Sequence, residues 1–89
     1  MINYLNKIDA LTDCIIDEYN SKHEPVTKMI NYEYYCGKLH QLFELAQEET
    51  TTADFVFYYE YRKEDRDRIA KLINDSIITP IYKATRAAI

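Results

Sequence analysis

The chain has 89 residues, of which 47% are hydrophobic, and a formal net charge of −4 at pH 7. This length and composition indicate one small folded domain spanning residues 1–89, and they exclude a disordered segment. The acidic balance argues against general DNA binding, which requires a basic face. No apolar run approaches the roughly 20 residues that cross a bilayer, and no signal peptide is recognisable, so we expect a cytoplasmic protein that does not span a membrane.

The first predicted element is an amphipathic helix over about residues 2–21. Its apolar residues recur at three- and four-residue steps, as on one face of a helix: Ile2, Leu5, Ile8, Leu11, Ile15 and Tyr19. Polar residues point in other directions; these are Lys7, Asp13, Asp17 and Glu18. Pro25 ends the pattern, because a proline cannot extend a preceding helix and disfavours the helical region for the residue before it.

A second helix is predicted for about residues 27–48, with Thr27 as the residue whose hydroxyl caps its first turn. Gly37 is the only glycine of the chain and falls inside this helix. A glycine there costs about 1 kcal/mol relative to alanine. It is either tolerated, or it marks the close approach of another backbone or a ligand; the sequence leaves both interpretations open.

The third predicted helix covers about residues 54–88, with a kink near Pro80. Its beginning is ambiguous, because the aromatic alternation from Phe55 to Tyr61 favours a strand. No other strand is available for pairing, so we expect either helix or an extended segment docked on a neighbouring subunit. The charge run from Arg62 to Arg68 is typical of a solvated helical face.

Together these elements predict an all-α fold, with an N-terminal amphipathic helix packed on a long helical hairpin. Because a chain of this size has a narrow stability margin, we expect it to form oligomers.

The residues that could support metal or catalytic chemistry are sparse. The four soft metal-ligand candidates lack the spacing of a zinc site: Cys14, His23, Cys36 and His40. A single glycine excludes a glycine-rich phosphate loop. Neither Ser21 nor Ser76 lies in a nucleophile-elbow sequence. We therefore predict no catalytic residue, no metal and no cofactor, and a protein that binds rather than catalyses.

Tyrosine is abundant, with nine in the chain. A phosphate-bearing aromatic ligand needs flat rings, a hydroxyl or N–H group for the edge of the base, and a cation for each phosphate. These groups occur close together along the second helix: Thr27, Tyr32, Tyr34, Tyr35 and Lys38. The same tyrosines could equally be ordinary core and interface residues.

Two stretches, about half of the chain, resemble the helical hairpin of phage anti-CBASS proteins, the small sponges that sequester cyclic oligonucleotide signals. In the first, the segment from His23 to Thr27 is followed by Lys38, 15 residues after His23, and by Leu39, Leu42 and Leu45. In the second, Asp67-Arg68 opens a helix and Arg86-Ala87 lies near its end. The family's base-stacking tyrosine is replaced by His23, and a glycine in its last helix by Pro80.

The resemblance implies a homo-oligomer, possibly a hexamer, that binds cyclic dinucleotides between subunits through His23, Val26, Thr27 and Lys38. Tyr34 or Tyr35 could stack on the base in place of the missing tyrosine. A second site for cyclic trinucleotides is implied at three further residues: Arg68, Thr85 and Arg86. The implied mechanism is reversible sequestration of the signal without hydrolysis.

Two other functions remain open from the sequence. An acidic, tyrosine-rich helical face could dock on a host protein and inhibit it. Alternatively, the chain could be an oligomeric scaffold without a small ligand.

Overall fold

The computed structural model describes residues 2–87, and all regular structure in this range is helical. The elements are α1 (Tyr4–Asn20), α2 (Pro25–Glu49), α3 (Thr52–Glu60), α4 (Lys63–Ile73), a π-helical turn η1 (Asn74–Ile78) and α5 (Thr79–Ala87). The predicted all-α class is confirmed. Among these helices, none combines the length and the apolarity needed to cross a membrane.

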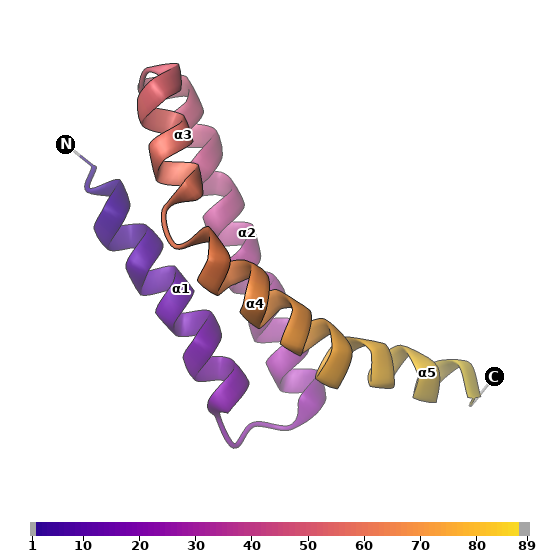
Figure 1. Ribbon diagram of the computed structural model, residues 1–89. Helices are drawn as coiled ribbons and strands as arrows, with labels where there is room; N and C mark the ends of the chain where they lie inside the picture. Colours follow the sequence, from indigo (N-terminus) through magenta and orange to yellow (C-terminus); the bar gives the residue numbers. More distant parts are fainter. Residues whose placement is uncertain (1, 88–89) are drawn as a thin grey trace.

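The first two helices form an antiparallel pair, and the rest of the chain returns along them (Figure 1). A short turn connects α1 to α2, and the chain reverses again before α3. The returning helices α3 and α4 lie beside α1 and α2, whereas α5 extends away from them (Figure 1). The molecule is therefore elongated, with extents of 49 × 25 × 19 Å.

Local side-chain chemistry explains where α1 and α3 begin. The Asn3 side chain accepts a hydrogen bond from the backbone N–H of Asn6 at 3.1 Å, and Thr51 accepts one from Asp54 at 3.2 Å. The predicted capping role of Thr27 is wrong, because α2 already begins at Pro25. Proline suits the first position of a helix, where its missing N–H has no intrahelical partner to lose.

The core consists of two adjoining apolar clusters. The larger cluster joins α1, α2, α4 and η1 through Ile15, Leu39, Ile69, Ile73 and Ile77. The smaller one joins α1 and α2 near the start of α1 through Tyr4, Ile8, Leu42 and Ala46. The two clusters contain all of the predicted apolar face of the first helix except Leu5. Each cluster contains residues of both α1 and α2, so the two clusters together hold α1 against α2.

The predicted third helix over about residues 54–88, with its kink near Pro80, is interrupted earlier in the described residues, and residue 88 lies outside them. The chain leaves the helical conformation at Tyr61 and Arg62, and Arg62 adopts a left-handed backbone with φ 56°. The segment from Phe55 to Glu60 is nevertheless helical, which resolves the ambiguity between helix and strand. The break is held by ion pairs from Arg62 to α1, which are contacts between distant parts of the chain.

The change of direction expected near Pro80 begins earlier, in η1 (Figure 1). The backbone N–H of Thr79 donates to the carbonyl of Asn74, five residues earlier, as in a π-helix. Pro80 follows directly, and a proline ring clashes with the carbonyl four residues before it in a regular α-helix. A wider turn before Pro80 accommodates this ring, and π-turns are themselves a recognised cause of helix bending.

A candidate ligand groove between α1 and α2

The nine residues predicted to bind ligand lie in three separate regions. His23 is in the turn between α1 and α2, and Val26 and Thr27 are in the first turn of α2. Tyr34, Tyr35 and Lys38 are in the middle of α2, and Arg68, Thr85 and Arg86 are on α4 and α5. Thr27 and Lys38 are separated by 11 residues of α2, which is roughly 16 Å along a helix. One protomer therefore does not bring the predicted residues into a single site.

A shallow groove of about 520 Å³ runs between α1 and α2. It is lined by Ile2, Lys7, Ala10, Leu11, Lys38, Gln41, Leu42 and Leu45. The lining is mostly aliphatic, and its only charged side chains are those of Lys7 and Lys38. In a chain with net charge −4, this groove is a local cationic site with an apolar floor.

Tyr34 places an aromatic ring beside this groove. The Lys38 Nζ atom lies 5.4 Å from the centre of the Tyr34 ring, a cation–π contact. The ring is 60% exposed. Tyr35 contacts the Tyr34 ring edge-on, at 5.7 Å between ring centres. Thus one predicted aromatic residue is exposed next to one predicted cation.

Tyr35 instead points toward the core and packs against the larger apolar cluster. Burial is the main reason that the pKa of its hydroxyl is raised, with smaller contributions from Cys14 and Glu18. Its contribution to a ligand site is therefore indirect, through the position of Tyr34.

The turn between α1 and α2 contains a polar network around Glu18. This side chain is only 7% exposed, although its sequence pattern placed it on the polar side of the first helix. Its carboxylate accepts hydrogen bonds from Asn31 at 2.9 Å and Ser21 at 3.2 Å, and pairs with His23 Nδ1 at 2.6 Å. The hydrogen bond with His23 is the largest cause of the lowered Glu18 pKa. One ring nitrogen of His23, Nδ1, is therefore occupied by the contact with Glu18.

His23 also lines a second, more polar hollow of about 490 Å³, together with Lys28 and Ser76. Lys28 Nζ donates to the carbonyl of Tyr19 at 2.8 Å, so this lysine stabilises the end of α1. Val26 is 51% exposed and lies, like Thr27, outside this hollow's lining. The resemblance implied a single pocket containing both His23 and Lys38. In the structure, His23 lines the polar hollow at the turn, whereas Lys38 lines the apolar groove further along α2.

The remaining predicted residues lie on α4 and α5, with Arg68 far from Thr85 and Arg86. Arg68 donates to Asp65 at 3.4 Å, and the Thr85 hydroxyl donates to the carbonyl of Ile81 at 3.0 Å. Arg68 and Arg86 are separated by 18 residues of nearly continuous helix. A shared site for these two arginines would require more than one copy of the chain.

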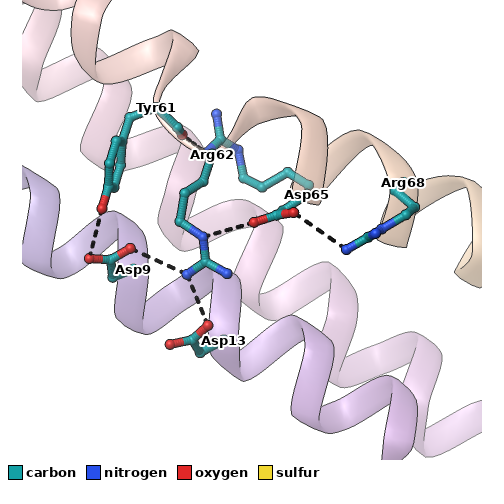
Figure 2. A network of polar contacts seen from close by, with 7 residues as sticks. Asp9, Asp13, Tyr61, Arg62, Asp65 and Arg68 are labelled. Carbon is teal, nitrogen blue, oxygen red and sulfur yellow. Dashed lines mark hydrogen bonds and ion pairs between the residues drawn. The ribbon is translucent and has the colours of Figure 1, made fainter.

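The charge run after α3 has a structural role that sequence reasoning missed (Figure 2). Arg62 donates to Asp13 at 2.9 Å, Asp65 at 3.1 Å and Asp9 at 3.3 Å, and the Tyr61 hydroxyl donates to Asp9 at 3.1 Å. This network connects the break between α3 and α4 to α1. The Asp65 contacts join residues three apart in the sequence, whereas the contacts with α1 depend on tertiary structure.

Arg66 lies on the other side of this break. Its guanidinium donates to the backbone carbonyls of Tyr61 and Tyr59 and lies 5.3 Å from the centre of the Phe43 ring. Burial lowers its pKa. Arg66 therefore donates hydrogen bonds to the carbonyls at the end of α3, and its guanidinium has a structural role.

Sequence reasoning also missed Lys7 and Gln41 as groove residues. Lys7 was placed among the polar residues of the first helix, and only the packing of α1 on α2 brings it opposite Lys38. Within residues 2–87, no three His, Cys, Asp or Glu side chains are arranged to hold a metal ion. Cys14 and Cys36 are free thiols.

No family model matches the chain, and no curated protein or solved structure is significantly similar to it.

Proposed function

We propose that this protein is a non-enzymatic binding protein that sequesters a cyclic di- or trinucleotide, with the groove between α1 and α2 as its ligand site. The observation that carries the proposal is the lining of this groove, in which Lys7 and Lys38 are the only charged residues around an aliphatic floor. Such a surface suits a ligand that is both flat and anionic, because the apolar floor accepts a base while each ammonium group pairs with a phosphate.

Tyr34 supports the same ligand class. Its exposed ring next to Lys38 offers a stacking surface, and base–aromatic stacking contributes about 1–3 kcal/mol per base in single-stranded nucleic-acid complexes. The mechanism needs no chemical step. Tight, reversible binding lowers the concentration of free ligand, and the ligand is released unchanged.

The proposal includes a homo-oligomer, with the hexamer implied by the anti-CBASS resemblance as its specific form. The groove is shallow and open to solvent, so a second subunit would be needed to enclose a ligand. His23, Val26 and Thr27 would then contribute from a neighbouring copy. A trinucleotide site containing Arg68, Thr85 and Arg86 would likewise have to form between copies. The proposed ligands are cytoplasmic signals, so the proposed location is the host cytoplasm.

Isothermal titration calorimetry and native mass spectrometry with a panel of cyclic di- and trinucleotides test this proposal. We expect Lys38→Ala and Lys7→Ala each to weaken binding by about tenfold or more, because each removes one charge-assisted contact. Lys71→Ala is the matched control, since Lys71 is an exposed lysine on α4 that pairs with Asp75. Binding that survives the double variant Lys7→Ala/Lys38→Ala would exclude the groove as the site.

A second candidate is the acidic helical inhibitor that docks on a host protein. The exposed Val56 and Phe57 on α3, with Asp54 on the same helix, favour it, because exposed apolar residues beside acidic ones suit a basic protein surface. A protein that ignores every nucleotide in the panel would favour this candidate over sequestration. Its own test is whether Phe57→Ser abolishes capture of a basic host protein while the fold remains intact.

A further inference from the structure

Among the described residues, helix α5 contacts the rest of its chain mainly through the turn that precedes it and through Ile81, which packs against the larger apolar cluster. It has nine residues, none of them buried, and it extends beyond the other helices (Figure 1). Tyr82 is 59% exposed there. A helix of this length is marginal in water by itself, and helices in proteins are stabilised mainly by packing of an apolar face. Packing of its exposed side on another surface would therefore stabilise α5.

The outer side of α3 offers such a surface. This helix also has no buried residue, and Val56 and Phe57 are 51% and 57% exposed. Its sequence is apolar around most of its circumference, which is typical of a helix that is enclosed by other elements. Within the described residues α3 contacts α1 and α2, and its exposed Asp54 and Phe57 line a shallow hollow beside the start of α1.

The charges of the two helices are complementary. Helix α5 carries Lys83 and Arg86 and no acidic residue, whereas α3 carries Asp54 and Glu60 and no basic residue. None of these four side chains forms an ion pair with another residue in the described part of the chain. Pairing of α5 with α5, or of α3 with α3, would juxtapose like charges, which is unfavourable, while pairing of α5 with α3 joins opposite charges.

The two helices of one chain cannot make this contact. Residues 63–78 separate them as an almost continuous helix, which spans roughly 24 Å. Even if α5 folded back at Pro80, its nine residues would reach only about 13 Å. The contact must therefore join two copies.

We infer that α5 of one copy docks on the outer face of α3 of a second copy, with Tyr82 against Val56 and Phe57 and with Lys83 and Arg86 facing Asp54 and Glu60. Because the two surfaces differ, this contact is head-to-tail. Repetition of a head-to-tail contact produces a closed ring if the rotation closes, and a filament if it does not. This inference does not depend on nucleotide binding.

Sedimentation velocity and native mass spectrometry of the full chain over a range of protein concentrations test this contact. The double reversals Lys83→Glu/Arg86→Glu and Asp54→Lys/Glu60→Lys should each raise the concentration for half-association at least about tenfold. An equimolar mixture of the two variants should associate again, because each then meets a surface of opposite charge. Lys22→Glu, an exposed charge reversal in the turn after α1, should leave association unchanged.

A second pair of variants keeps the test valid if a charge reversal disturbs folding. Phe57→Ala and Tyr82→Ala should weaken association to a similar extent, whereas Leu72→Ala, which truncates an exposed apolar residue on α4, should not. A wild-type chain that stays monomeric up to high micromolar concentration would overturn the inference. Loss of association in the α5 variants alone, with the α3 variants unaffected, would also overturn it, because α5 would then contact another surface.

Discussion

Arg62 combines an unfavourable backbone with favourable side-chain contacts. Its left-handed φ of 56° costs about 1 kcal/mol for a residue with a Cβ atom. Its guanidinium pairs with Asp9, Asp13 and Asp65, and hydrogen bonding to these carboxylates raises the pKa of Arg62. Because the carboxylates are well exposed to water, the ion pairs contribute only modestly to stability.

We therefore expect Arg62→Ala to lower the free energy of unfolding by about 1 kcal/mol, since it loses the ion pairs and keeps the backbone strain. Arg62→Gly loses the same pairs but relieves the strain, so it should stay within about 0.5 kcal/mol of the wild type. Urea denaturation of both variants measures the difference. Equal losses in the two variants would show that the backbone conformation at this position costs nothing.

Glu18 predicts a defined pH dependence of stability. Its pKa in the folded protein lies below 4.5, mainly because of the hydrogen bond with His23, while burial acts in the opposite direction. A lowered folded-state pKa stabilises the fold above the unfolded-state pKa, and this stabilisation is lost as the pH falls through the folded-state value. The wild type should therefore be more stable than Glu18→Gln at pH 7, and this difference should shrink below about pH 4.5. Thermal unfolding between pH 3 and 7, with the exposed Glu48→Gln as control, measures it.

Thr12 is fully buried, and its hydroxyl has no hydrogen-bond partner among the described residues. An unpaired buried hydroxyl costs free energy that a methyl group of the same size does not. Thr12→Val should therefore stabilise the protein by about 1 kcal/mol, measured as a higher urea midpoint with an unchanged slope. A destabilised variant would indicate that the hydroxyl is hydrogen-bonded in solution.

At the scale of elements, Gly37 lies in the middle of α2 with open space around it. A Cβ atom added there meets nothing within 4 Å in the protomer, so no close approach inside the chain requires glycine. Gly37→Ala should therefore raise the free energy of unfolding by about 0.5–1 kcal/mol, because alanine favours the helix. If the variant is more stable but binds nucleotide less well or associates less, Gly37 faces a ligand or a second copy.

The elements themselves follow from the sequence to different extents. Both α1 and α2 were predicted, and their predicted boundaries differ by a few residues from those observed. The break at Arg62 could not be predicted, since it depends on Asp9 and Asp13, about 50 residues earlier in the chain. The π-turn before Pro80 was missed for a different reason: proline signals a disturbed helix but not the geometry that resolves it.

At the scale of the whole molecule, stability should depend on protein concentration. An elongated chain with α5 and the outer face of α3 uncovered buries little surface alone, and association stabilises a folded state by mass action. We expect the Tm of the wild type to rise with concentration across 5–500 µM, and the Tm of Lys83→Glu/Arg86→Glu to stay constant. Differential scanning calorimetry tests this, and a constant wild-type Tm would contradict an association linked to folding.

The sequence by itself determined the all-α class, because the three- and four-residue spacing of apolar residues that indicates a helix can be recognised within a short stretch of sequence. It also offered Lys38, Tyr34 and Tyr35 among the candidate ligand residues, without deciding between a ligand site and ordinary core or interface packing of the tyrosines. Only the tertiary structure decided that Lys7 lies across the groove from Lys38, that Glu18 is buried and that Arg62 connects α4 to α1. The physical reason is that these features depend on contacts between residues far apart in the chain, which periodicity within one helix does not specify.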